Sequence, residues 1–528
     1  MKRFPGLKHL FESKLAVLLT TILITILLAT GLFFLNKHFL VTLPVYGGEL
    51  SIGEIGAPRF INPLLTQSQS DRDLTTLVFA GLFRKNGNST EPLLAENVEI
   101  TEDGKKYTIK IREDAIFHDG QPVTAHDVLW TINAIQDPLI KSPYQSLWDG
   151  VVFKEVDEKT VEIELSAPYS GFLEQLDIGI MPAHIWEQVP VDHIIFSEYN
   201  LSPIGSGPFI VTSITKDNAG IPVMVGLEAF RGFADGRPFI QNLQMLFFEN
   251  NESLLQAYGD REIESFFTER QDIDEMILED SVVSKHPTSK HIYLFLNQNL
   301  SPILRNADVR QAIDQILNND DIDGGEKLLQ DQKWVKNQTT QIYEKEIDDE
   351  VTQLSFSIAT TSFSDLDDLA VSIRNKLFQA GILARVQVFE PGSLKQEIIR
   401  ERAFESLIFG QNIEHPADLF AFWHSSQKLD PGLNISLFEN SRADKVLENI
   451  RESVDTEEML SAEQDFFEII DTENPAIHLQ NIQLLHILPS KIEGYAKDII
   501  LDNAEDRLAN INSWFIETDD IWSFLRRR

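Results

Sequence analysis

A glutamate behind a short apolar run is the most informative candidate for chemistry in this sequence. Residues 406–409 (Ser-Leu-Ile-Phe) form the run, Gly410 ends it, and Glu414 follows four positions later. A carboxylate beyond a buried strand, in a cleft that excludes water, can accept charge-assisted hydrogen bonds from a ligand's ammonium group. The chain contains 82 acidic residues, however, so an ordinary solvated carboxylate is the competing interpretation.

The same stretch carries aromatic and imidazole side chains. Phe422 and Trp423 could line an apolar pocket or belong to a core, and the sequence leaves both interpretations open. His415 and His424 lie nine positions apart, with no third ligand at metal-binding spacing. We therefore expect no metal site, and we regard the predicted loop 410–423 as the place to look for a ligand.

Two other groups resemble parts of a catalytic site. His118 and Asp119 could form an acid–base pair, and Ser206 between two glycines could be a nucleophile. A turn leading into a helix explains the first pair, and a Gly-rich turn entering a strand at 209–211 explains the serine. A phosphate-binding Gly-rich loop, an HExxH helix and a Gly-x-Ser-x-Gly elbow are all absent from the sequence. We therefore expect no catalytic function and no cofactor.

Composition narrows the function further. With 528 residues and 43% hydrophobic residues, the chain is long enough for two or more cores. Its formal net charge of −37 repels phosphate backbones, so we expect no nucleic-acid partner. The absence of cysteine excludes disulfides, a cysteine nucleophile and a lipid-modified cysteine.

An apolar segment near the N-terminus predicts a membrane anchor. Residues 15–35 carry no charge and number about 21, enough for one transmembrane helix. Four basic residues precede the segment, so the positive-inside rule places the N-terminus in the cytoplasm and everything after Asn36 outside. A cleaved signal peptide is the alternative, since such peptides also begin basic and apolar. We predict an uncleaved anchor, because the run is long and no convincing cleavage site follows it.

Short strands dominate the first part of the folded chain. Asp103-Gly104 separates the segment 98–101 from the alternating segment 107–112, a hairpin pattern. Residues 161–165 alternate in the same way. Thr124 with Asp127 predicts the capped start of a helix that ends at Asp137-Pro138.

From about residue 290 helices alternate with strands. Apolar residues at helical spacing predict helices around 309–317 and 366–380, and residues 382–389 follow the second helix as a strand. This alternation predicts an α/β lobe with an open sheet, in which ligands bind beyond the carboxyl ends of strands. The acidic, Gln-rich stretch 320–350 is expected to be a loop or a weakly structured excursion.

Several segments, taken in order, resemble one family. The most specific is EPLLAENVEITEDGKKYTIKIREDAIFHDGQPVTAHDV at 91–128. It resembles the signature region of the peptide-binding proteins of ABC importers, the oligopeptide/dipeptide/nickel-binding family 5. Further resemblances, in the family's order, are INPLLTQSQSDRDLTTLVFAGLF, VDEKTVEIELSAPY, PIGSGPFIV, LFLNQNLSPILRNADVRQAIDQIL and LFQAGILARVQVF. The resemblance extends from about residue 48 to residue 500.

The resemblance implies a fold and a function. The expected fold is α/β and bilobed, like the large, three-subdomain periplasmic-binding proteins of type II, with mixed sheets. Such a monomer captures peptides between its lobes and delivers them to permease and ATPase subunits. Another solute, such as a nickel complex or a sugar derivative, is an alternative within the fold. A surface peptide sensor or chaperone that feeds no permease is an alternative from another class.

The resemblance also implies ligand-binding residues. Glu414 lies at the spacing of an aspartate that holds the ligand's amine in many relatives, where it follows a Gly-Trp pair. Here Gly410 and Gln411 occupy the positions of that pair, so the tryptophan is missing. Gln67 falls where some relatives place an acidic pocket residue. Tyr144 and Trp148 fall in a stretch that contributes an aromatic side chain to the cleft, and Trp423 completes the candidate set.

The predicted organisation of the chain has six parts. They are a cytoplasmic N-terminus at 1–14, the anchor at 15–35, a tether at 36–47, lobe 1 at 48–287 with a subdomain at about 63–199, lobe 2 at 288–488, and a C-terminal return to lobe 1 at 489–528.

Overall fold

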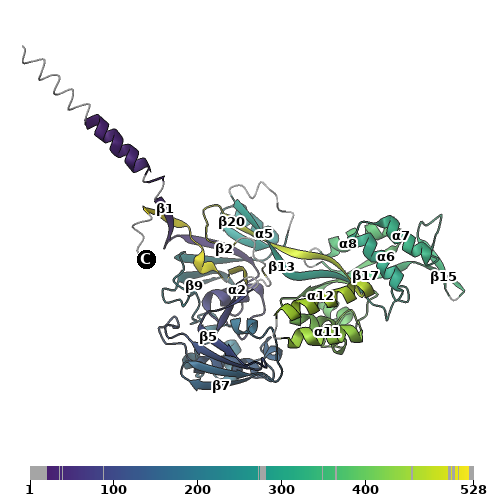
Figure 1. Ribbon diagram of the computed structural model, residues 1–528, viewed down its shortest axis with the longest axis horizontal. Helices are drawn as coiled ribbons and strands as arrows, with labels where there is room; N and C mark the ends of the chain where they lie inside the picture. Colours follow the sequence, from purple (N-terminus) through teal and green to yellow (C-terminus); the bar gives the residue numbers. More distant parts are fainter. Residues whose placement is uncertain are drawn as a thin grey trace, which may run out of the picture.

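The computed structural model describes most of the chain. The described residues are 21–34, 36–37, 40–86, 89–270, 273, 281–347, 349–362, 366–453, 456–496, 501, 506–508 and 510–522. Figure 1 shows their arrangement around one large sheet.

That sheet has ten strands. In spatial order they are β18 (Leu383–Phe389), β17 (Ser355–Thr361), β19 (Ser406–Asn412), β13 (Ser281–Leu296), β20 (Ala476–Pro489), β12 (Ser265–Thr268), β2 (Glu49–Ile55), β11 (Asn242–Phe248), β10 (Pro222–Ala229) and β9 (Phe209–Lys216). β2 runs parallel to β11 and β12, and β17 runs parallel to β18 and β19, whereas the other pairs are antiparallel. The predicted α/β class with mixed sheets is therefore confirmed.

Two long strands connect the ends of the molecule. β13 has 16 residues and β20 has 14, and they pair from Ser281 opposite Pro489 to Phe295 opposite Ala476. Figure 1 shows both strands passing from the elements of the first half of the chain to the green helices of the second half. β13 pairs with β20 along one edge and with β19 along the other. The sheet is therefore continuous across this junction.

The first half of the chain also forms a smaller antiparallel sheet. Its strands are β5 (Ala95–Ile100), β6 (Lys106–Ile111), β8 (Thr160–Glu164) and β7 (Val152–Asp157). β3 (Phe83–Asn86) pairs with β4 (Ser89–Pro92), and the main helices are α2 (Gln69–Val78), α3 (Ala125–Gln136) and α5 (Asn251–Gly259). The predicted hairpin is confirmed. The predicted helix cap is also confirmed, since the backbone N–H of Thr124 donates to the Asp127 carboxylate at 2.8 Å.

Helices cover the sheet in the second half of the chain. They are α6 (Ala307–Asn318), α7 (Ile322–Asp331), α8 (Leu366–Gln379), α10 (Leu419–Trp423), α11 (Ser441–Glu452) and α12 (Thr456–Glu473), with a short turn α9 (Pro391–Ser393) that continues as a π-helix at Leu394–Ile399. The predicted apolar face of α6 is buried at Val309, Ile313 and Ile316. α8 joins the parallel strands β17 and β18, the βαβ arrangement that the alternation predicted.

Buried side chains form separate clusters. The largest combines residues between 50 and 267 with residues between 484 and 514, including Leu508, Ile511 and Trp514. Two others lie within residues 292–482, one around α6 and α8 and one around α10 to α12. The C-terminal segment therefore packs against the first half of the chain.

The prediction for residues 320–350 is wrong. This stretch forms α7 and the strands β14 (Val335–Lys336), β15 (Tyr343–Ile347) and β16 (Glu350–Gln353), of which β15 pairs with both neighbours. Leu329, Trp334 and Tyr343 are buried in the cluster around α6. These three buried side chains hold the stretch in place, although they are widely spaced in the sequence. Many acidic residues lie between them, so the hydrophobic periodicity is not visible in the sequence.

The predicted end of a strand at Gly410 is also wrong. β19 continues to Asn412, and Gly410 and Gln411 pair with Ile292 and His291 of β13. Glycine is tolerated inside this strand because the long partner β13 supplies hydrogen bonds along the whole segment. The loop of interest therefore begins after Asn412.

The N-terminal residues extend from the body of the molecule. Residues 21–34 are helical and expose Leu23, Leu28 and Phe33, and Figure 1 shows this purple helix projecting away from the sheet. Among the described residues, we find no helix with the length and apolarity needed to cross a bilayer. The predicted transmembrane segment 15–35 is not confirmed, and its residues 15–20 and 35 lie outside the described residues. β1 (Leu40–Val45) follows and pairs with the C-terminal β21 (Glu517–Trp522).

A buried ion cluster attaches the C-terminal segment to the first half of the chain. Arg507 donates from Nε to Asp73 of α2 at 3.1 Å and from Nη2 to Glu54 of β2 at 2.8 Å. At most 8% of any of the three side chains is exposed. Burial raises the pKa of Glu54 to about 8, even though the positive charge of Arg507 opposes the shift.

We expect Arg507→Met to lower the free energy of unfolding by about 3–5 kcal/mol, because the two buried acidic side chains Asp73 and Glu54 then lose their cationic partner. Urea unfolding measures the change. The matched control is Lys491→Met, which removes an exposed ion pair with Glu264 and should cost at most about 1 kcal/mol. Similar losses in both variants would contradict this role for Arg507.

Candidate ligand-binding cleft

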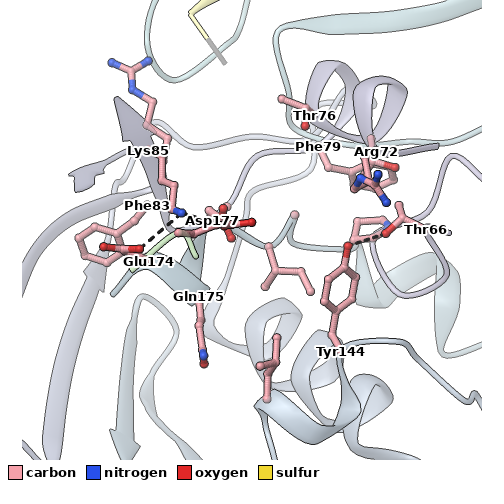
Figure 2. A pocket seen from close by; sticks show the side chains of 18 of the residues that line it. Thr66, Arg72, Thr76, Phe79, Phe83, Lys85, Tyr144, Glu174, Gln175 and Asp177 are labelled. Carbon is pink, nitrogen blue, oxygen red and sulfur yellow. Dashed lines mark hydrogen bonds and ion pairs between the residues drawn. The ribbon is translucent and has the colours of Figure 1, made fainter. Parts of the chain in front are cut away.

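A cavity of about 760 Å³ lies among residues from both halves of the chain. Its walls come from α2 and the loop before it, from β3, and from residues 144–148, 169–179 and 412–418. Figure 2 shows side chains from several of these segments pointing into the same space. This volume falls in the range of small-molecule and peptide sites, about 300–1,000 Å³.

Asp71 fixes the wall in front of α2. Its Oδ1 accepts from the backbone N–H groups of Arg59 and Phe60, at 2.7 and 3.1 Å. Its Oδ2 accepts from those of Gln67 and Ser68, at 3.0 and 3.1 Å. The carboxylate therefore closes the loop between these residues and also caps the helix, where a negative charge is favoured.

The loop held by Asp71 brings a hydroxyl to the cavity. Thr66 Oγ1 and the Tyr144 hydroxyl lie 2.7 Å apart and are hydrogen-bonded. Trp148, one turn after Tyr144, is 1% exposed and packs against Phe153 and Phe172 with ring centroids 5.7 and 6.0 Å away. The Tyr144 hydroxyl therefore belongs to the polar part of the cavity wall, whereas most of the Trp148 ring is buried against other aromatic side chains.

A lysine and two glutamates meet at another side of the cavity. Lys85 of β3 places Nζ 3.1 Å from Oε2 of Glu414 and 3.4 Å from Oε2 of Glu174. Only 7% of the Lys85 side chain is exposed, against 28% and 29% for the two glutamates. A buried ammonium is costly unless it is paired, so these carboxylates hold Lys85 in the wall.

Asp418 positions Glu414. Its Oδ2 accepts from the backbone N–H groups of Glu414 and His415, at 3.1 and 2.9 Å, which fixes the turn after β19. Burial raises the pKa of Asp418, and the hydrogen bond from the His415 backbone opposes the shift. Asn412 Nδ2 donates to Oε1 of Glu414 at 2.6 Å. The Glu414 carboxylate is therefore oriented by its own loop, with Oε2 directed at Lys85.

The cavity holds charges of both signs. Its charged side chains are Arg72, Arg84, Lys85, Lys290, Glu174, Asp177, Glu269, Glu414 and Asp418. Figure 2 shows Arg72 on the same side as the Thr66 and Tyr144 hydroxyls, and Lys85 with Glu174 on the opposite side. Such a lining suits a ligand that carries both an ammonium and a carboxylate group, together with backbone amides.

The structure brings three of the seven predicted site residues to the cavity, namely Glu414, Tyr144 and Trp148. The other four are not among its lining residues. Gln67 is exposed next to Thr66, and Gly410 lies within β19. Gln411 is buried, and its side-chain nitrogen and oxygen have no hydrogen-bond partner among the described residues. No ligand tests any of the seven, so their roles stay predictions.

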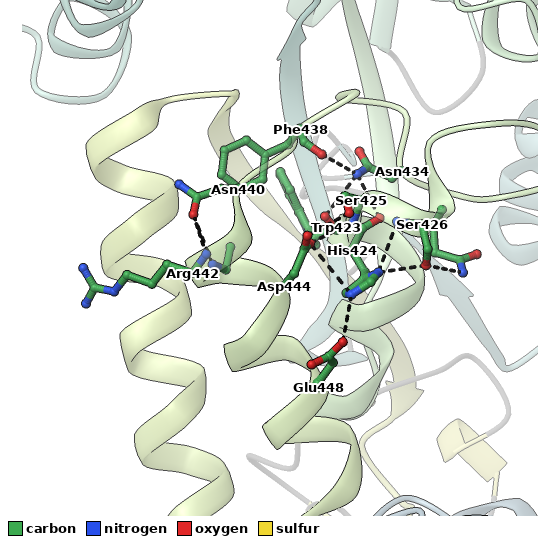
Figure 3. A network of polar contacts seen from close by, with 12 residues as sticks. Trp423, His424, Ser425, Ser426, Asn434, Phe438, Asn440, Arg442, Asp444 and Glu448 are labelled. Carbon is green, nitrogen blue, oxygen red and sulfur yellow. Dashed lines mark hydrogen bonds and ion pairs between the residues drawn. The ribbon is translucent and has the colours of Figure 1, made fainter.

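Trp423 and His424 are not among the residues that line the cavity. The Trp423 ring packs edge-on against Tyr293 and Phe466, at centroid distances of 5.7 and 6.0 Å. Figure 3 shows the polar network beside it, in which His424 Nδ1 lies 2.8 Å from Ser426 Oγ and Nε2 lies 3.7 Å from a carboxylate oxygen of Glu448. Of the two interpretations open for Trp423, core packing describes its surroundings here.

The groups that resembled catalytic residues have structural contacts. His118 Nδ1 accepts from the Gly205 N–H at 3.3 Å, and Nε2 lies 3.1 Å from the Gly207 carbonyl oxygen. Burial lowers the pKa of His118 to about 4. Ser206 is buried beside these contacts, and its hydroxyl has no partner within the described residues. The histidine therefore ties the predicted turn to the Gly-rich turn before β9.

Sequence reasoning missed Arg72, Lys85 and Glu174. Arg72 occurs in α2, where its hydropathy is typical of an exposed helix position. Lys85 lies on the same face of β3 as Phe83, but a lysine that follows an arginine in a short strand predicts an exposed side chain. No motif marks them, because Lys85 and Glu414 are 329 positions apart in the sequence. Only the fold brings these charges together.

Comparisons with known proteins define the class. Residues 89–323 match the middle region of the bacterial extracellular solute-binding proteins, family 5. The oligopeptide-binding protein AppA of Bacillus subtilis is 23% identical over 516 residues, covering 90% of this chain and 92% of AppA. A probable D,D-dipeptide-binding periplasmic protein of Escherichia coli, DdpA, is 24% identical over 501 residues, covering 88% of this chain and 93% of DdpA.

Solved structures show the same fold. The substrate-binding protein CtaP of Listeria monocytogenes superimposes with a TM-score of 0.75 at 20% identity, covering 89% of this chain and 99% of CtaP. AppA of B. subtilis in complex with a nonapeptide gives 0.68 at 22% identity, covering 90% and 100%. The fold is therefore that of the periplasmic binding proteins, and residues 89–323 are similar to the middle region of family 5 of the bacterial extracellular solute-binding proteins.

We expect Trp423→Ala to lower the free energy of unfolding by about 3–5 kcal/mol, because it removes a large, fully buried ring from the cluster around α10 to α12. Chemical denaturation measures the loss. The comparison variant is Tyr144→Phe, which deletes one hydroxyl at the cavity and should cost about 0.5–1.5 kcal/mol. A loss below about 1 kcal/mol for Trp423→Ala would contradict its assignment to the core.

Proposed function

We propose that this protein is the extracytoplasmic solute-binding component of an ABC importer and that its cargo is peptides. The supporting observation is the combination of a family 5 fold with a cavity of about 760 Å³ that carries charges of both signs. Relatives named as oligopeptide- and dipeptide-binding proteins align with about nine tenths of the chain. The expected partners are permease and ATPase subunits, and the binding protein contacts the permease directly. We expect the binding protein to be a monomer.

Capture follows from the placement of the cavity. A ligand that contacts both β3 and the loop after β19 binds more tightly when these walls are close together, and this difference in affinity drives closure. We assign the walls to lobe 1 at 48–287 and lobe 2 at 288–488, with residues 489–528 returning to lobe 1. The long strands β13 and β20 pass between the lobes and are the natural place for bending.

In the proposed complex, Glu414 accepts hydrogen bonds from the ligand's terminal ammonium group. Its position supports this role, because Asp418 and Asn412 orient the carboxylate toward the cavity. Tyr144 and Trp148 shape the wall near Thr66. The other four predicted residues do not line the cavity, so their proposed contribution is to support the lining residues structurally. They are Gln67, Gly410, Gln411 and Trp423.

The cargo is tested by identifying what co-purifies with the protein by mass spectrometry, followed by thermal shift with a pool of pentapeptides. A ligand that binds only the folded state raises the melting temperature. Stabilisation by peptides supports the proposal. Stabilisation by a nickel–histidine complex or a sugar, with peptides inert, would overturn it, and the similarity to a NikZ structure solved with Ni(L-His) makes the nickel complex a useful control.

Glu414→Gln should weaken binding of unblocked pentapeptides by about tenfold or more, because the amide that replaces the carboxylate lacks the negative charge that pairs with the ligand's ammonium group. Binding of the same peptides after N-acetylation should change little. Calorimetric titration measures both affinities, and Glu187→Gln, which alters an exposed pair with His126 outside the cavity, is the matched control. Equal losses for unblocked and acetylated peptides would remove the assigned role of Glu414.

We also propose that the N-terminal segment keeps the protein at the membrane, with its N-terminus in the cytoplasm. The exposed apolar side chains of residues 21–34 and the four basic residues at the N-terminus support this proposal. Anchoring keeps the local concentration near a permease high. The full chain should stay with membranes after a high-salt wash, and a variant lacking residues 1–36 should be released. A mature N-terminus that begins beyond residue 35 would instead indicate a cleaved signal peptide.

A further inference from the structure

The ion cluster at one side of the cavity has an uneven charge. Lys85 contributes one positive charge, and Glu174 and Glu414 contribute two negative charges, so their formal sum is −1. All three side chains line the cavity. Lys85 Nζ lies within 3.4 Å of a carboxylate oxygen of each glutamate, so one ammonium group serves two carboxylates. His415 Nε2 also lies 3.9 Å from Oε1 of Glu174, at the same side of the cavity. Lys85 is thus a cation placed against Glu414, the carboxylate that the proposed function assigns to the ligand's ammonium group.

The contacts of Lys85 come from different parts of the chain. Glu174 lies in η2 (Glu174–Asp177), close to β3 in the first half of the chain, whereas Glu414 follows β19 in the second half. The separations are therefore 89 positions for the pair with Glu174 and 329 for the pair with Glu414. If the walls of the cavity move apart, Lys85 keeps Glu174 and loses Glu414.

We propose that Lys85 is a built-in competitor for the ammonium site and that it determines the affinity for ligands with a free amino group. This inference rests on the proposed function, in which Glu414 receives the ligand's ammonium group. In the ligand-free protein, the Lys85 ammonium group occupies that place. When a ligand enters, its ammonium group replaces Lys85 at Glu414, and Lys85 retains its ion pair with Glu174.

The exchange keeps the buried Lys85 ammonium group paired with a carboxylate after the ligand has displaced it from Glu414. A displaced lysine with 7% exposure could not remain charged without a partner, since an unpaired buried charge is strongly unfavourable. Glu174 provides that partner at 3.4 Å before and after the exchange. With a ligand bound, two ammonium groups face two carboxylates, and the formal charge of the cluster becomes zero.

The site then selects ligands by charge. A ligand with one ammonium group at this position neutralises the cluster, whereas an N-acetylated ligand leaves the Lys85–Glu414 pair in place. A ligand with a second cation beside the first would give the cluster an excess positive charge. The favoured class is therefore a peptide with a free α-amino group and no second cation next to it.

Two variants test the competition in opposite directions. Lys85→Met combined with Glu174→Gln removes the competitor but keeps the formal charge of the cluster at −1, so affinity for unblocked pentapeptides should rise about tenfold or more. Glu174→Gln alone leaves Lys85 with Glu414 as its carboxylate in the cluster, so affinity for the same peptides should fall by a similar factor. The second variant is a conservative change and decides the question if the first does not fold.

Calorimetric titration with one pool of unblocked pentapeptides and the same pool after N-acetylation provides the readout. Acetylated peptides should show no change in any variant. The control is Lys106→Met with Glu162→Gln, which removes an exposed Lys–Glu pair of 2.8 Å on β6 and β8, outside the cavity. An unchanged or reduced affinity for unblocked peptides in the Lys85 double variant, or an unchanged one in Glu174→Gln, would overturn the proposal. If the unaltered protein binds no peptides at all, the proposed function fails instead.

Discussion

The hydrogen-bonded pairing of β13 with β20 is the constraint on which the rest of the structure depends. These strands belong to one continuous sheet but touch different hydrophobic clusters along their length: Leu484 and Leu488 of β20 pack in the first cluster, and Ile292 and Leu294 of β13 pack in the cluster around α6. Both packed bodies are therefore held by the same two strands. The cavity takes its lining from residues on both sides of this connection.

Strand pairing of this kind resists sliding, since a shift of one residue would turn every side chain to the other face of the sheet. Bending and twisting cost less, because they keep the ladder of hydrogen bonds. The register along β19 and β13 also fixes where β19 ends, and hence where the turn with Glu414 starts. The position of the Glu414 carboxylate thus follows from the sheet and from Asp418, whereas the position of Lys85 follows from the first half of the chain.

The sequence predicted the elements whose signals are local. The hairpin of β5 and β6, the cap of α3 and the apolar face of α6 depend on residues within one or two turns of each other, and each is confirmed. The stretch 320–350 failed because its order depends on three anchors spread among acidic residues, which are buried in the same cluster as residues of α6 and α8.

The cleft was predictable only in part, for a similar reason. Glu414 could be singled out because it follows an apolar strand, and Tyr144 and Trp148 through a resemblance to known sequences. No pattern in the neighbouring sequence indicates Lys85, because its ion-pair partners are carboxylates far away in the sequence. The end of β19 was misplaced by two residues because a glycine was taken as a stop signal, although pairing with β13 continues past it.

A binding protein that supplies a permease must release its cargo as well as capture it, and an internal cation serves both steps. Without competition, a desolvated carboxylate would hold an ammonium group tightly, since ion pairs strengthen as water is excluded. With Lys85 nearby, the departing ammonium group leaves no bare carboxylate, because Lys85 returns to Glu414 while Glu174 still supports it. Release therefore does not leave the Glu414 carboxylate without a cation. The same exchange lowers the affinity for the ligand, because Lys85 competes with it for Glu414. The position of a single lysine between two carboxylates thus links the selectivity of the cleft to the ease with which it empties.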